Sequence, residues 1–146
     1  NTKQKKEIIT QVCMVVGIEL QNYLEWFCER LGETIGMLHD AGGCNDTLDW
    51  GNITLAGEIT DFEWIYVPGI PLPWGDGHLN LSERRKKEII YAFEICIKLS
   101  YLLHKEKRYL NSKIVLLLEN GYNKSSKEKL NIFDKLKKKF AFEKFC

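Results

Sequence analysis

The sequence predicts an all-α fold, an irregular bundle of about five helices with a Pro/Gly/Trp-rich insertion near residues 41–81. Two observations predict this class. Outside the insertion, apolar residues recur every three or four positions, which is the spacing of helices that bury one face. Apolar residues also make up 45% of the 146 residues, which is enough to build a core. We therefore expect residues 1–146 to form a single helical domain.

The first element, residues 3–39, is predicted to be one long helix because its apolar side chains keep helical spacing throughout. Gly17 and Gly32 are positions where this helix could bend, since glycine is a poor helix former. Gly42-Gly43 is expected to end it. His39, in the last turn, is expected to interact favourably with the helix dipole.

The insertion has a different composition, with seven of the eleven glycines, all three prolines and three of the four tryptophans. Helical spacing of its apolar residues favours a short helix over residues 55–66, with Thr54 as its N-cap. A strand over residues 64–67 is the alternative, because these residue types favour sheets. Residues 68–81 are predicted to be a loop.

Three more helices are predicted after the insertion. The first, residues 82–107 with Ser82 as its N-cap, has so wide an apolar face that we expect it at the centre of the bundle. The second, residues 110–119, is expected to end at Gly121. The last, residues 125–142, starts with the pattern of a capping box, a serine followed three residues later by a glutamate.

Composition also limits the cellular setting. No apolar run approaches the ~20 residues that a membrane-spanning helix needs. The five cysteines are odd in number and show no CxxC spacing, so a zinc cage is not indicated. Most of them stand in apolar helical patterns, which favours reduced thiols and a cytoplasmic protein. Four N-x-S/T sequons occur as well, but they matter only in a secretory pathway.

Charge is segregated along the chain although the net charge is only +1. Residues 31–83 hold nine acidic residues and no lysine or arginine, whereas residues 84–146 hold seventeen basic residues and seven acidic ones. A block of one sign often marks a partner of the opposite sign. The acidic middle could equally fold against the basic half, and the sequence leaves both interpretations open.

The acidic middle is our main candidate site. Acidic groups spaced along a surface can imitate a phosphate backbone and occupy a basic active site, and tryptophans supply the desolvated anchors of interfaces. We therefore predict a protein-binding inhibitor of the immunity or antidote type, which blocks a basic, nucleic-acid-directed toxin or nuclease. The predicted partner-binding residues are Asp46, Asp49, Trp50, Glu58, Asp61, Glu63, Trp64, Trp74 and Asp76. The tryptophans could instead fix an irregular segment onto the bundle.

Helix-spaced carboxylates form a second candidate site at Glu29, Glu33, Glu58 and Asp61. The later pair resembles the E-x-x-D helix of all-α nucleotide pyrophosphohydrolases of the MazG type, and the resemblance covers residues 29–66. It implies that the four carboxylates bind Mg²⁺ and that a nucleoside triphosphate is cleaved between its α and β phosphates. In this chain Arg30 replaces the second glutamate of the family's first motif.

The basic C-terminal half defines a third function class, nucleic-acid binding. Its positive charge is concentrated in residues 84–87 and 135–139, and clustered lysines and arginines neutralise phosphates. These residues could also be a solvated helix face. The three histidines have no metal-ligand spacing, and neither a catalytic triad nor a Gly-rich phosphate loop is present in the sequence.

Overall fold

The computed structural model describes residues 2–45, 48, 50–60, 65–69, 80–104 and 109–143. This part of the chain confirms the all-α class. Its elements are α1 (Thr2–Val16), η1 (Leu20–Asn22), α2 (Tyr23–Asp40), β1 (Cys44–Asn45), η2 (Trp50–Asn52), β2 (Ile65–Tyr66), α3 (Leu81–Leu103), α4 (Asn111–Ser125) and α5 (Asn131–Lys139). Here η marks short 3₁₀ helices.

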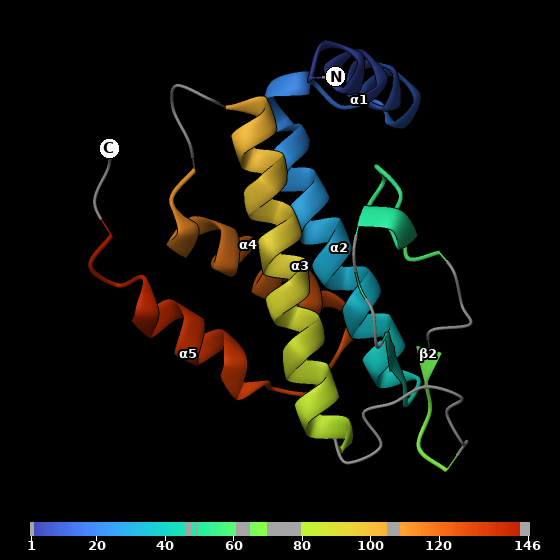
Figure 1. Ribbon diagram of the computed structural model, residues 1–146, viewed down its shortest axis with the longest axis vertical. Coiled ribbons are helices and arrows are strands. Elements are labelled where there is room, and N and C mark those ends of the chain that lie inside the picture. The colour runs from blue at the N-terminus through green and yellow to red at the C-terminus, as the bar shows by residue number, and fades with distance from the viewer. Residues whose placement is uncertain are drawn as a thin grey trace.

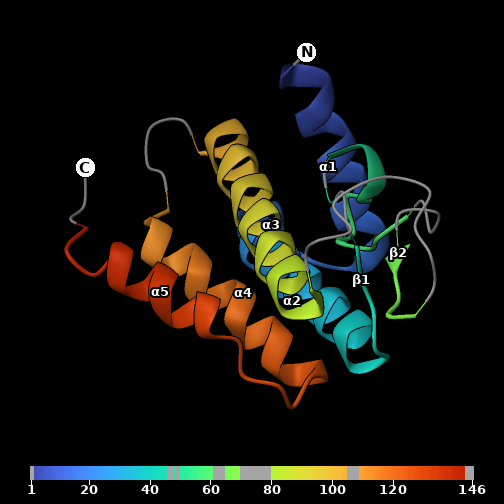
Figure 2. The ribbon, with the colours of Figure 1, turned by 60° about the horizontal axis from the view of Figure 1, so that its bottom comes forward.

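Helix α2 lies at the centre of the bundle. It packs most extensively against α4 and also contacts α3 and β1. Figure 1 shows α2 and α3 side by side along the long axis, with α1 across one end of the pair. In Figure 2, α4 and α5 lie on one side of this pair, and α1 and the insertion lie on the other. The helix after the insertion, α3, was expected at the centre; it contacts α2, α4 and β1, but α2 has the more extensive contacts, above all with α4.

The predicted helix over residues 3–39 is two helices. α1 ends at Val16, and Gly17 adopts a φ of +77°, a left-handed conformation that favours glycine. Gly32 does not bend α2. It lies at the contact with α4, where a β-carbon would overlap with the backbone carbonyl oxygen of Leu118. The two glycines therefore have different roles, a chain reversal and a close helix contact.

Helix α3 begins and ends close to the predicted positions, but its cap differs. Asn80, not Ser82, is the N-cap, and its side-chain oxygen accepts a hydrogen bond from the Glu83 N–H at 2.9 Å. The helix ends at Leu103, where His104 takes the C-cap position. An asparagine is as good an N-cap as a serine, so the sequence alone did not discriminate between them.

The last two helices differ most from prediction. α4 continues past Gly121 to Ser125, because Gly121 packs directly on the backbone of Glu29 in α2. Ser125 does not cap a following helix. Its hydroxyl donates instead to the Glu33 carbonyl at 2.6 Å. Residues 126–130 form no helix or strand, and α5 covers only Asn131–Lys139.

The predicted short helix over residues 55–66 is also wrong. Residues 54–60 form a tight turn in which the Thr54 hydroxyl accepts from the Glu58 N–H at 3.2 Å and Gly57 has a φ of +75°. The alternative, a strand, is confirmed at Ile65–Tyr66, which pairs antiparallel with Cys44–Asn45. Of the predicted loop over 68–81, residues 70–79 lie outside the described residues.

The core joins buried side chains of α2, α3, α4 and α5, and α1 adds Ile9 and Cys13. The largest fully buried side chains include Tyr23, Phe27 and Tyr122. Burial of this size supplies most of the free energy that favours the folded state. Among the helices that the structure describes, none has the length and apolar character to cross a membrane.

Candidate functional site

Most of the predicted partner-binding surface lies outside the described residues. These are Asp46, Asp49, Asp61, Glu63, Trp64, Trp74 and Asp76. Of the other two, Trp50 begins η2, and Glu58 is exposed in the turn over residues 54–60. The structure thus leaves this prediction open and shows only how the neighbouring parts of the insertion are attached.

The described parts of the insertion are anchored to two helices. From α2, the Tyr23 hydroxyl donates to the Leu55 carbonyl at 2.5 Å. From α3, the guanidinium carbon of Arg84 lies 4.1 Å from the ring centroid of Tyr66, in cation–π geometry. Gly57 also packs closely on α2, since a β-carbon there would lie 3.1 Å from Leu31 N. The insertion is therefore an irregular segment fixed to the bundle at several points.

The four carboxylates of the alternative magnesium site are not presented on two helices. Glu29 pairs with Lys124 of α4 at 2.8 Å, and Glu33 pairs with Arg30 at 3.5 Å. Glu58 lies in a turn, and Asp61 is outside the described residues. Across the described ranges, no three His, Cys, Asp or Glu side chains are grouped so that they could hold a metal ion. The E-x-x-D helix that the resemblance implies is not formed at Glu58.

The basic half divides into buried and exposed parts. Arg84 and Arg85 are buried, contrary to their expected place on a basic surface. Arg85 donates to Glu128 at 2.5 Å and to the His39 carbonyl at 2.6 Å. The lysines around α5 do form an exposed set. Its members are Lys127, Lys129, Lys135, Lys138 and Lys139.

A polar cluster that the sequence analysis missed is buried between α2, α3 and α4. His39 Nδ1 lies 2.8 Å from the Tyr122 hydroxyl, and His39 Nε2 is hydrogen-bonded to the Glu88 carboxylate. The second oxygen of Glu88 accepts the Asn45 N–H of β1 at 2.7 Å. The side chains of His39 and Glu88 are fully buried. The cluster thus joins three helices and the start of the insertion.

Burial governs the electrostatics of this cluster. Desolvation raises the pKa of Glu88 above the ordinary glutamate value, and the hydrogen bond and charge of His39 partly oppose that rise. Burial likewise raises the pKa of Tyr122. A histidine between a carboxylate and a hydroxyl is the arrangement of many proton-transfer sites. Here His39, Glu88 and Tyr122 are all buried, and their hydrogen bonds join α2, α3, α4 and β1, so the cluster holds the fold together.

A sequence signal for this cluster did exist. Glu88 stands on the apolar face of its helix, four residues before Ala92 and seven before Ile95. A carboxylate on such a face needs a buried partner. His39 occupies the equivalent position on its own helix, four residues after Ile35. The interpretation of His39 as a simple dipole partner was therefore incomplete.

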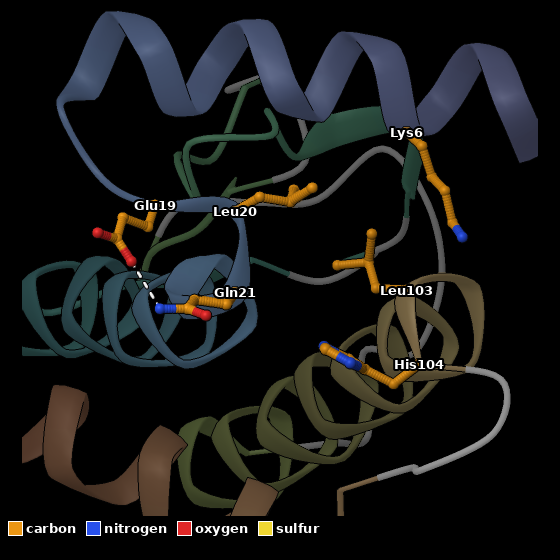
Figure 3. A pocket seen from close by; sticks show the side chains of 6 residues that line it. All are labelled: Lys6, Glu19, Leu20, Gln21, Leu103 and His104. Carbon is orange, nitrogen blue, oxygen red and sulfur yellow. Dashed lines mark hydrogen bonds between the residues drawn. The ribbon is translucent and has the colours of Figure 1, made fainter.

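A surface pocket of about 510 Å³ lies between α1, η1 and the end of α3 (Figure 3). Glu19, which the chain reversal after Gly17 leaves exposed, accepts a hydrogen bond from the Gln21 amide at 2.6 Å. Burial and the charge of Lys6 lower the pKa of His104, which favours its neutral imidazole. Lys6 and Glu19 lie at opposite ends of this pocket, so its charges do not converge on one point. Among the described residues that line this pocket, no two groups are placed for acid–base or nucleophilic chemistry.

Comparisons of the chain with protein-family models, with curated proteins and with solved structures give no match. Function is therefore argued from the residues and geometry of this chain.

Proposed function

We propose that this protein is a protein-binding inhibitor of the immunity or antidote type, and that its acidic, tryptophan-bearing insertion blocks a basic, nucleic-acid-directed toxin or nuclease in the cytoplasm. The observation that carries the proposal is the attachment of the insertion. Tyr23, Glu88 and Arg84 fix its described parts to α2 and α3. An irregular segment on a rigid helical body is a common way to present a binding surface.

The described ion pairs add support. Three cations of the C-terminal half, Arg85, Lys124 and Lys137, pair with acids outside residues 31–83. These acids are Glu29, Glu119, Glu128 and Asp134. Glu58, inside the acidic stretch, is exposed. These three cations do not neutralise the acidic stretch, which supports the proposal that the stretch complements an external basic surface and so favours fast association and selectivity.

The first test reverses the charge of Asp46, Asp49, Asp61 and Glu63 to lysine together. We expect the variant to lose its protein partner because like charges would then meet at the interface. The measurement is capture from the source extract by the tagged protein at low and high salt, with native mass spectrometry of the retained complex. The proposal expects one basic protein at one-to-one stoichiometry with the unmodified chain.

A matched variant controls for net charge. Glu7, Glu19, Glu94 and Asp134 are all exposed and lie outside the acidic stretch, so their reversal to lysine should leave capture intact. Equal capture by both quadruple variants would show that the insertion is not the interface. Retention of nucleic acid instead would favour binding by the exposed lysines around α5. A co-purifying nucleotide with Mg²⁺ would favour the pyrophosphohydrolase alternative.

A further inference from the structure

Helix α1 covers the bundle with only part of its apolar surface. Ile9 and Cys13 are buried against the core, whereas Ile8 is 53% exposed and Val15 is 86% exposed. On a helix these four side chains fall on one broad apolar face. Half of that face therefore packs inward, and the other half is exposed, with Ile8 next to the C-terminal part of α3.

A cavity of about 500 Å³ occupies the space beside α1. Three elements form its wall, namely α1, the turn at Leu55 and the C-terminal part of α3. The apolar side chains that line it are Ile8, Ile9, Leu55, Leu99 and Leu102. Its volume falls within the range of ~300–1,000 Å³ that is typical of small-molecule sites. An apolar lining of this kind fits an alkyl chain.

The polar part of the lining carries one sign of charge. Two exposed lysines, Lys5 of α1 and Lys98 of α3, complete it. None of the described residues that line this cavity is acidic. The side chain of a lysine can lay its methylene stem along an apolar wall while its ammonium group stays in water. The mouth of the cavity is thus suited to an anion.

The floor of the cavity is fixed. Leu99 is fully buried in the core, and the carbonyl group of Leu55 accepts the Tyr23 hydroxyl at 2.5 Å. Tyr23 itself is fully buried. The side of the cavity formed by Leu55 and Leu99 is thus ordered before a ligand binds, so it loses little conformational entropy on binding, and this favours binding.

We propose that this cavity binds a single-chain amphiphile with an anionic head, such as an alkyl carboxylate or alkyl phosphate. The alkyl chain lies against Ile8, Leu55, Leu99 and Leu102, and the head pairs with Lys5 and Lys98. The occupant is a free monomeric amphiphile, not a membrane leaflet, because Leu55, Leu99 and Leu102 lie within a cavity between elements and are buried or half-buried. The proposal is independent of what the acidic insertion binds.

The test titrates the full chain with octanoate, decanoate and dodecanoate below their micelle concentrations. Affinity should rise about three- to fourfold for each added methylene that becomes buried. Decyl phosphate should bind as decanoate does, whereas decanol and decyltrimethylammonium should bind at least tenfold more weakly. Calorimetry gives the affinities, and methyl NMR should place the shifts at Ile8, Leu55, Leu99 and Leu102.

Two variants make the test specific. Lys98→Glu should weaken decanoate binding at least fivefold, while Lys129→Glu, which makes the same charge change at an exposed lysine outside the lining, should not. Ile8→Gln, at a position that is 53% exposed, should also weaken binding. Circular dichroism checks that each variant is folded.

Three results would overturn the proposal. They are equal binding of decanoate and decyltrimethylammonium, affinity that does not change with chain length, and equal binding by Lys98→Glu and Lys129→Glu. Binding to phosphatidylglycerol vesicles without binding of free decanoate would assign the apolar face to a membrane surface and would equally exclude the cavity as a ligand site.

Discussion

At the scale of single residues, Glu88 has an unusual position. Its side chain is fully buried, and its two oxygens hold His39 of α2 and the backbone of Asn45 in β1. A buried carboxylate is costly unless it is hydrogen-bonded and paired. Here both conditions are met, and the consequence is a fixed relation between α2, α3 and the start of the insertion.

Glu88→Ala should lower the free energy of unfolding by about 3–5 kcal/mol, because the imidazole of His39 and the Asn45 N–H would stay buried without their partner. Glu88→Gln keeps the shape, and its carbonyl oxygen can accept the Asn45 N–H while its NH2 group donates to the Nε2 of a neutral His39, so its cost should be clearly smaller. Urea unfolding followed by circular dichroism measures both values. Equal costs for the two variants would show that side-chain volume, not hydrogen bonding, is what Glu88 contributes.

The raised pKa of Glu88 determines how the free energy of unfolding changes with pH. Between the ordinary glutamate pKa and the raised value, the folded state holds a proton that the unfolded state has lost. The free energy of unfolding attributable to this group therefore falls as the pH rises through that interval. Glu88→Gln has no such proton. The difference in free energy of unfolding between the unmodified chain and this variant should therefore become smaller from pH 4 towards neutrality, as measured by urea unfolding at each pH.

At the scale of elements, the contact of α2 with α4 depends on residues without side chains. Side chains at Gly32 and Gly121 would overlap with the backbone of the facing helix, and one at Gly36 would meet the hydroxyl of Ser125. The absence of β-carbons lets the two helices approach closely, so that Ser125 can donate to the Glu33 carbonyl. The local sequence predicts that the helix ends at Gly121, but in the structure Gly121 is a contact residue within the helix.

Gly121→Ala tests this contact. In an exposed helix the change should stabilise by about 1 kcal/mol. Here the new β-carbon meets the backbone of Glu29, which cannot move aside as a side chain would, so we expect a loss of about 1–3 kcal/mol or more. The neighbouring exposed residue supplies the control, because Asn120→Ala should be neutral or slightly stabilising in thermal unfolding. A gain in stability for Gly121→Ala would contradict the close packing.

At the scale of the whole molecule, the chain consists of a tightly packed body and a lightly attached first helix. α2, α3, α4 and α5 share one core, whereas α1 is joined to it by the reversal at Gly17 and contributes Ile9 and Cys13. Regions with few buried apolar contacts open at lower free energy than the core does. α1 should therefore open without unfolding of the body.

Hydrogen exchange by mass spectrometry checks this difference. Amides of α1 should exchange much faster than those of α2 and α4. Ile9→Ala removes the main anchor and should accelerate exchange in residues 2–16 with little effect on residues 23–40. Val15→Ala, at a largely exposed position of the same helix, should leave the exchange rates of residues 2–16 and of residues 23–40 unchanged. If Ile9→Ala accelerated exchange equally in both helices, α1 would be part of one cooperative unit with the body.

The sequence by itself determined the all-α class, the existence of most helices and the separation of charge, because these follow from apolar spacing and composition. It also placed the body of α3 correctly. The predictions that were wrong concern helix ends and the insertion. Gly121, Ser125 and Thr54 each have a local preference that predicts one structure, and each was overruled by a contact or turn that the local pattern does not contain.

Only the tertiary structure decided which residues meet. It brought His39, Glu88 and Tyr122 together from three helices. It buried Arg84 against Tyr66 of the insertion and Arg85 against Glu128, and it opened an apolar cavity between Lys5 and Lys98. The physical reason is that burial and pairing are properties of distant segments brought into contact. Local spacing shows which face of a helix is apolar, but not which face of another helix will cover it.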